Sequence, residues 1–282
     1  MNRPWQDHCR IVLVRPSQPG NIGAVARIMY NFGLKELVLI QSEVPTDAPE
    51  AIAMATHGLP ILQSARCCHR WEEAVGACHL VFGTSARLGG LFRTQSVVTP
   101  RAFFPAFWPD WTTETIALVF GPERTGLLTE EISQCHYLLT IPAAVEYPVL
   151  NLAQAVACCL YELFQVGLEQ QLVESTTRSK LNPVRASHHT AVFEQSETKH
   201  QSAPFATQER MFLHLEAGLR AIHFLWNEKA DAQMHALRHL IGRAQPSMME
   251  VQLLHGIARQ LIWYAEHAGK TKVEAEPPKD ET

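Results

Sequence analysis

Three segments rich in glycine and small polar residues are the parts of this sequence best suited to holding a ligand: residues 15–27, 120–127 and 141–155. A fourth and weaker segment spans residues 83–87. Taken singly, each has an ordinary explanation, because glycine after a strand often serves only a tight turn. Taken together, they carry arginine, glutamate, asparagine and several glycines. Such a set could hold a polar ligand by backbone groups and a few fixed charges.

The elements that would position these segments follow from five short apolar runs, which predict buried strands at residues 11–14, 37–40, 80–82, 116–120 and 137–141. The runs are continuously apolar and helix-like segments separate them. We therefore predict an α/β fold with a parallel sheet that helices cover on both faces. Active sites of such sheets lie beyond the carboxyl ends of the strands, which is where the four segments would begin.

The first helix between these strands is expected to begin near Asn21, which together with Gly20 is the candidate N-cap, and to stop at a left-handed Gly33. Its apolar stripe would face the sheet. At 100° per residue, Arg27 falls away from that stripe and lies one turn beyond Gly23. The Arg27 guanidinium could then point off the sheet, above a residue that has no side chain.

The chain after the last strand predicts a second, smaller domain. Asn151 is a plausible cap for the helix that closes the first domain, residues 1–168. A polar stretch over residues 169–206 predicts a linker. Helical periodicity then predicts three amphipathic helices in a domain over residues 207–268. We expect a disordered tail over residues 269–282.

The last of the three predicted helices has the clearest local signals. Ser247 and Glu250 have the spacing of a capping box, so the helix should begin between them. Its apolar stripe is expected at Leu254, Ile257, Leu261 and Tyr264.

Composition limits the class of protein. With 282 residues, 46% hydrophobic and 18% charged, the chain can bury a core, and its apolar runs are too short to span a membrane. The N-terminal residues lack the apolar stretch of a signal peptide, so we expect a cytoplasmic protein. A net charge of −4 argues mildly against a nucleic-acid partner, because phosphate binding usually accompanies a basic excess. The net charge is a weaker argument against nucleic acid if the basic residues of the first half of the chain, where the motifs lie, form a local positive surface.

The cysteines and histidines do not indicate a metal site. Seven cysteines include two vicinal pairs and no Cys-x-x-Cys spacing, which predicts buried free thiols rather than disulfides or zinc ligands. The 14 histidines scatter without a spacing that would aim two ligands at one metal. We therefore expect no metal cofactor.

A family resemblance adds to this interpretation. The sequences GNIGAVAR at residues 20–27, FGPERTGL at 120–127 and LNLAQA at 150–155 resemble the three ordered motifs of the SPOUT-class RNA 2′-O-methyltransferases. The segment 83–87 and the helices around residues 237–257 resemble the TrmJ-like, tRNA-modifying branch. The resemblance implies a deep trefoil knot in the α/β domain, a homodimer, and S-adenosylmethionine held in the knot.

The resemblance also implies roles for individual residues. It implies cofactor contacts at Thr84, Ser85, Ala86, Gly121, Ile141, Val149 and Leu150. It implies catalytic or substrate-positioning roles for Arg27, Asn21, Glu123 and Asn151. The chain departs from the family at Val149, where a serine is usual. The missing hydroxyl matters little if it only packs, and could lower activity somewhat over tenfold if it orients the ribose.

The reaction implied by the resemblance is methyl transfer to a ribose 2′-hydroxyl of tRNA, at cytidine or uridine 32 of the anticodon loop. Arg27 is the expected central residue: a guanidinium is a poor base, so we expect it to hold a phosphate and stabilise the developing alkoxide. Glu123 would fix Arg27 or a loop amide, or only form a turn, and Asn151 could be only a helix cap. Candidates for RNA contacts in the C-terminal helices are Arg238, Arg243 and Arg259.

Two alternatives stay open at the level of sequence. An enzyme of the same fold could act on ribosomal RNA. A non-catalytic RNA-binding relative would explain Val149 and the net negative charge.

Overall fold

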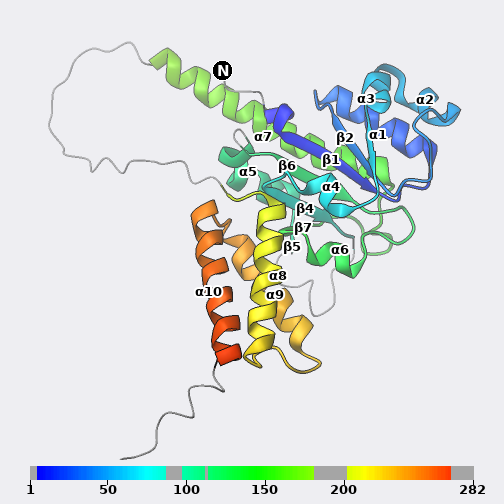
Figure 1. The fold of residues 1–282 in the computed structure, drawn as a ribbon. Coiled ribbons are helices and arrows are strands. Elements are labelled where there is room, and N and C mark those ends of the chain that lie inside the picture. Colours follow the sequence, from blue (N-terminus) through cyan, green and yellow to red (C-terminus); the bar gives the residue numbers. More distant parts are fainter. Residues whose placement is uncertain (1–4, 87–96, 112–113, 181–201, 268–282) are drawn as a thin grey trace, which may run out of the picture. The chain divides into compact units, whose positions relative to one another are not determined.

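A computed structural model of the chain (Figure 1) describes residues 5–86, 97–111, 114–180 and 202–267. The chain divides into two compact units, Met1–Gln201 and Ser202–Thr282. Among the helices that the structure describes, none is long and apolar enough to cross a membrane. The expected tail over residues 269–282 lies outside the described residues.

The first unit is built on a seven-stranded sheet with the strand order β3-β2-β1-β6-β4-β7-β5. Every neighbouring pair is parallel, as predicted. The strands are β1 (Cys9–Val14), β2 (Glu36–Ile40), β3 (Arg66–Cys68), β4 (Leu80–Thr84), β5 (Val97–Val98), β6 (Ile116–Phe120) and β7 (Tyr137–Leu139). The two strands that were not predicted are β3 and β5, because β3 begins with a charged arginine and β5 is only two residues long, so neither forms a readable apolar run.

Both faces of the sheet are buried, which explains why the strands are continuously apolar. In β1, Ile11 and Leu13 lie on one face and Val12 and Val14 on the other, and each is at most 1% exposed. The core on the Ile11 face is formed with α1 (Pro19–Asn31), α5 (Pro100–Trp111) and α7 (Leu152–Lys180). The smaller helices of the unit are η1 (Trp5–His8), α2 (Pro49–Ala55), η2 (Thr56–Gly58), α3 (Leu59–Gln63), α4 (Trp71–Val75) and α6 (Thr129–Ser133).

Helix α1 begins earlier than predicted. Its N-cap is Gln18 and Pro19 occupies the first turn, because the fixed φ of proline suits that position. Asn21 is therefore not the cap, and its side chain is free to bond elsewhere. The predicted stop is confirmed: Gly33 has φ +79°, the left-handed conformation that glycine adopts without a steric penalty.

Gly23 of α1 serves packing between helices. A Cβ atom at Gly23 would lie 2.0 Å from the carbonyl oxygen of Ala51 in α2. The space above Gly23 thus holds backbone of α2, and it is not open space beneath Arg27 as the helical wheel suggested. The missing side chain allows two helices to approach closely.

Helix α7 confirms its predicted cap and corrects the predicted linker. Asn151 Oδ1 accepts a hydrogen bond from the Ala153 amide (2.9 Å), and Gln154 Oε1 accepts one from the Asn151 amide (3.1 Å). The helix then continues to Lys180, so residues 169–180 of the expected linker are helical. Their polar composition does not stop a helix, because this stretch contains no glycine or proline.

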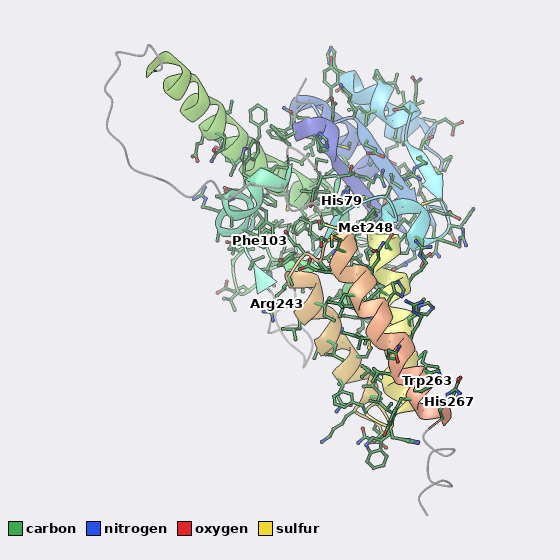
Figure 2. The ribbon with its side chains drawn as sticks, turned by 60° about the vertical axis from the view of Figure 1, so that its left-hand side comes forward. His79, Phe103, Arg243, Met248, Trp263 and His267 are labelled. Atoms are coloured by element: carbon green, nitrogen blue, oxygen red, sulfur yellow. The ribbon has the colours of Figure 1, made fainter. Side chains whose placement is uncertain are left out.

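The described residues of the second unit, 202–267, form three helices, α8 (Phe205–Ala221), α9 (Ala230–Arg243) and α10 (Met248–His267). The capping box is confirmed, because Ser247 Oγ and the Ser247 amide both donate to Glu250 Oε2 at 2.8 Å. Figure 2 shows Met248 at the start of α10, with Trp263 and His267 near its end. The predicted stripe is partly wrong: Val251 and Ala258 are fully buried, whereas the side chains of two predicted core residues are exposed, Ile257 (44%) and Tyr264 (64%).

Candidate active site

A pocket lies at the carboxyl ends of β4, β6 and β7, where the motif segments meet. The strands end level with one another, since Thr84 pairs with Leu139 and Phe82 with Leu118. The Ser85 amide then donates to the Leu139 carbonyl oxygen (3.0 Å), which fixes the start of the loop after β4. The pocket is lined by Thr84–Ala86, Phe120–Leu127, Leu139, Ile141, Pro148–Leu150, Leu152 and Ala155.

All seven residues for which the resemblance implies cofactor contacts line this pocket: Thr84, Ser85, Ala86, Gly121, Ile141, Val149 and Leu150. They come from three segments that are far apart in the sequence. The parallel sheet brings these segments to one edge. Their role as cofactor contacts stays a prediction. Arg87, the last residue of the weaker segment, lies outside the described residues.

The loop after β6 forms one wall of the pocket by folding back on itself. A Cβ atom at Gly121 would lie 2.2 Å from the backbone nitrogen of Leu127. The Gly126 amide donates to the Pro122 carbonyl oxygen (2.9 Å), and Gly126 has φ +68°. Glycine at both positions is therefore required, by close backbone approach at the first and by conformation at the second. The loop presents backbone groups to the pocket at a fixed position.

A chain of hydrogen bonds joins three of the four predicted catalytic residues. Asn151 Nδ2 donates to Asn21 Oδ1 (2.9 Å), and Asn21 Nδ2 donates to Glu123 Oε1 (2.8 Å). These side chains come from the N-terminus of α7, the first turn of α1 and the loop after β6. Asn151 is thus more than a cap, because its carbonyl oxygen caps α7 while its amide group holds Asn21. Glu123 also lines the pocket.

Ser17 completes this network, although no sequence pattern singled it out. Its amide and its hydroxyl both donate to Glu123 Oε2, at 3.1 and 2.9 Å. Burial raises the pKa of the Glu123 carboxyl, but the hydrogen bonds from Asn21 and Ser17 outweigh it, so the pKa lies below its ordinary value. Glu123 is therefore ionised at neutral pH. No local signal marks Ser17, since its partner is 106 residues away.

Arg27 stands apart from this network. Its side chain is exposed, and it makes no hydrogen bond or ion pair with the residues that the structure describes. Both oxygens of Glu123 are occupied by Asn21 and Ser17, so the carboxylate does not fix Arg27, which was one of the roles expected for it. The Arg27 guanidinium carries a charge that no carboxylate of the described residues neutralises.

Arg15, at the start of the first motif segment, is used structurally. It has a left-handed backbone (φ +45°), and its guanidinium forms a bidentate ion pair with Glu131, in which Nη2 lies 3.0 Å from Oε2. Glu131 also accepts the Leu128 amide at 2.7 Å. The pair ties the loop after β1 to the start of α6, which places Ser17 beside Glu123.

Two further observations concern the cysteine, histidine and acidic side chains of the described residues. In the described part of the chain, no group of three histidine, cysteine or acidic side chains is arranged to hold a metal ion. All seven cysteines are free, and five of them are buried. The prediction of burial is wrong for Cys67 and Cys158, which are exposed.

Comparison with known proteins assigns the family. The model of the SpoU rRNA Methylase family matches residues 8–161, and that of the C-terminal domain of the tRNA methyltransferase TrmJ matches residues 206–272. The tRNA (cytidine/uridine-2′-O-)-methyltransferase TrmJ of Pectobacterium atrosepticum is 34% identical over 254 residues, 89% of this chain and 95% of that protein. TrmJ of Escherichia coli K12 is 35% identical over 252 residues, 88% and 92% of the two chains.

Solved structures agree with this result. The crystal structure of TrmJ from Z. mobilis ZM4 has a TM-score of 0.69 and 28% identity, over 89% of this chain and 98% of that chain. A probable methyltransferase from Bordetella pertussis Tohama I has a TM-score of 0.53 and 32% identity, over 57% of this chain and 97% of that one. The family model and the structural matches thus show that the parallel-sheet unit is that of a SpoU-type methylase. Within that class, the chain belongs to the TrmJ family.

Proposed function

We propose that this chain transfers the methyl group of S-adenosylmethionine to a ribose 2′-hydroxyl of tRNA, at cytidine or uridine 32 of the anticodon loop. The observation that carries the proposal is the pocket at the carboxyl edge of the sheet, with Glu123, Asn21 and Asn151 hydrogen-bonded beside it. Family membership supplies the reaction. The proposal includes the trefoil knot in the segments around the pocket, a homodimer, and action in the cytoplasm, where tRNA is modified.

The lining of the pocket suits the proposed cofactor. Leu139, Ile141 and Leu152 offer apolar surface for a purine ring. The glycine loop after β6 and the backbone around Ser85 offer polar groups for a ribose and an amino-acid moiety. When bound, S-adenosylmethionine supplies an electrophilic methyl group on a sulfonium. The chain's own residues must then place the ribose hydroxyl in line with that group.

Arg27 is proposed to hold the phosphate next to the target ribose. Its exposed guanidinium, without a carboxylate partner in the described structure, is available for a bidentate contact with phosphate. The same charge would stabilise the alkoxide that develops at the 2′-oxygen. Because arginine does not deprotonate in proteins, the proton of the hydroxyl leaves to a phosphate oxygen or to water.

Glu123 is proposed as a positioning residue. Its two oxygens accept three hydrogen bonds, from the Asn21 side chain and from the amide and hydroxyl of Ser17. A carboxylate so occupied, with a lowered pKa, is poorly suited to remove a proton. It fixes α1, the loop after β1 and the wall of the pocket relative to one another.

The test is methyl transfer to unmodified tRNA transcripts, with the modified nucleotide mapped by mass spectrometry. A 2′-O-methyl group at position 32 is the expected result. Methyl transfer to ribosomal RNA fragments, and not to tRNA, would show that the substrate is ribosomal RNA. Binding of tRNA without binding of S-adenosylmethionine would show a catalytically silent relative.

The role of Arg27 is tested by Arg27→Lys. This change should lower methyl transfer at least tenfold and leave the affinity for S-adenosylmethionine unchanged by calorimetry, because lysine keeps the charge and loses the bidentate geometry. Arg70→Lys is the matched control, since Arg70 is exposed and pairs with Glu73. Full activity of Arg27→Lys would refute the assignment.

A further inference from the structure

Four basic side chains meet on one surface of the second unit. Arg210 and His214 lie four residues apart on α8, and His255 and Arg259 lie four residues apart on α10, so each pair shares a helix face. The two helices are closely packed, since a Cβ atom at Gly218 of α8 would lie 3.0 Å from the Ala258 carbonyl oxygen of α10. We call these four residues the basic cluster.

The two histidines of the basic cluster are in direct contact. Nδ1 of His214 lies 2.9 Å from Nδ1 of His255, with ring centroids 4.9 Å apart and the rings inclined at 72°. Such a bond needs one Nδ1 to donate and the other to accept. The pair can therefore hold one extra proton while the bond lasts, but not two.

The basic cluster has no acidic partner in the described part of the chain. The carboxylates of α8 are engaged elsewhere: Glu209 pairs with Arg238 (2.6 Å) and Glu216 with Arg220 (2.9 Å). The charged groups acting on His255 are His214, Arg210 and Arg259, which are all basic. Burial together with these neighbours lowers the pKa of His255. The cluster thus concentrates positive charge on a chain whose net charge is −4.

The arginines of the basic cluster are exposed and available. Arg210 makes one long hydrogen bond, to Thr207 Oγ1 at 3.5 Å. Arg259 makes no hydrogen bond or ion pair with the described residues. In contrast, Arg238, a candidate from the sequence, is ion-paired and stacks over the Phe212 ring at 4.8 Å, so it has a structural role.

We propose that the basic cluster binds a phosphate of the RNA substrate, and that binding brings a proton onto the pair His214–His255. This inference rests on the RNA substrate of the proposed function. A phosphate supplies the negative charge that the cluster lacks, and both arginines can donate to its oxygens. It also offsets the repulsion that His214, Arg210 and Arg259 exert on a proton at His255, so the affinity for RNA rises as the pH falls.

A neighbouring aromatic ring favours RNA over a free phosphate ion. Trp263 lies one turn beyond Arg259 on α10, is 55% exposed, and stacks on His267 with ring centroids 4.6 Å apart (Figure 2). Exposed aromatic rings beside arginines are the usual means of stacking unpaired bases. Inorganic phosphate would use the basic cluster alone.

The experiment is fluorescence anisotropy of labelled tRNA with the full-length protein, between pH 6 and pH 8 and at several salt concentrations. The wild-type protein should bind about threefold to tenfold more tightly at pH 6 than at pH 8, which corresponds to an average uptake of about a quarter to a half of a proton over this range. The double variant His214→Gln/His255→Gln should lose most of this dependence. His223→Asn is the matched control, because His223 is exposed and has a left-handed backbone (φ +59°) that asparagine accepts.

The arginines are tested by salt dependence. Arg259→Gln should lower the slope of log Kd against log salt by about one, as expected for one lost phosphate contact. Arg220→Gln is the control, since Arg220 is paired with Glu216, and its slope should not change. Circular dichroism and thermal melting verify that each variant is folded.

The inference is overturned if the histidine double variant keeps the wild-type pH dependence, or if Arg259→Gln keeps the wild-type slope. Competition by inorganic phosphate as effective as that by an RNA oligonucleotide would also overturn it, because the cluster would then be a simple anion site. Methyl transfer at saturating tRNA is measured in parallel. A wild-type protein that binds tRNA in the expected way without transferring methyl groups would refute the proposed function and leave this inference standing.

Discussion

Asn21→Asp is the most informative single change in the candidate active site. The wild-type Asn21 amide donates to Glu123 Oε1 at 2.8 Å, and its oxygen accepts from Asn151. Aspartate has nearly the same shape and keeps the acceptor. It replaces the donor with a second carboxylate oxygen, which faces the ionised Glu123. The change therefore tests the hydrogen-bond network with little change in volume.

The size of the effect follows from the distance. Two carboxylate charges about 4 Å apart repel by about 1 kcal/mol in water and about 4 kcal/mol at an effective dielectric constant near 20. Glu123 is half-buried, so its environment lies between these limits. Since 1.36 kcal/mol corresponds to about one pKa unit, the shared pKa of the pair should rise by about one to three units. As in other carboxylate pairs, one proton would then bridge the introduced carboxylate and Glu123 at mildly acidic pH.

The assay measures the rate of methyl transfer by the variant divided by that of the wild type, from pH 6 to pH 8.5. This ratio removes the pH dependence that the two proteins share. At pH 8.5 both carboxyls of the variant are ionised, so the ratio should be tenfold or more below its value at pH 6. Thermal stability should follow the same sign: a raised pKa in the folded state costs stability as the pH rises through it. Asn21→Ala, which adds no charge, should give a ratio independent of pH. A flat ratio for Asn21→Asp would refute the network as described.

Three substitutions test the pocket, and one chemical modification tests the burial of the thiols. Gly121→Ala would place a Cβ 2.2 Å from a backbone nitrogen of its own loop, so it should weaken S-adenosylmethionine binding at least tenfold by calorimetry and cost about 1–3 kcal/mol of stability. Gly126→Ala meets no atom within 4 Å and is disfavoured only by its positive φ (+68°), so it should retain more affinity. Val149→Ser should raise methyl transfer somewhat over tenfold in a single-turnover assay if the hydroxyl orients the ribose, the value of one hydrogen bond, and should leave it unchanged if the hydroxyl only packs. A thiol reagent at pH 8 should modify Cys67 and Cys158 rapidly, and the other five only after denaturation, because burial raises the pKa of each. Rapid reaction of more than two thiols would contradict the described core.

Sequence patterns were sufficient for several features whose determining interaction is local, although the start of α1 was placed too late. The stop at Gly33, the cap at Asn151 and the capping box at Ser247 each depend on residues within one turn, and the structure confirms all three. The continuous apolar character of the strands was enough to predict a parallel sheet buried on both faces. Since parallel strands end at one edge, the sequence also placed the motif segments in one region.

Features that depend on which distant segments contact one another in the fold could not be predicted from the sequence. Helical periodicity marks a side of α1 as apolar, but it does not reveal that backbone of α2 lies above Gly23. The family resemblance implied a role for Glu123, but the path of the loop after β1 decided that its partners are Asn21 and Ser17 rather than Arg27.

The same limit applies to the second unit. The sequence determined that three amphipathic helices would form there, because a 3.6-residue period is a property of each helix alone. Only the packing of α8 against α10 decided which side of α10 is buried, and so brought His214 within 2.9 Å of His255, 41 residues away. Local sequence sets the shape and the polarity of each element, whereas the pairing of polar groups across elements depends on distances that exist only in the folded chain.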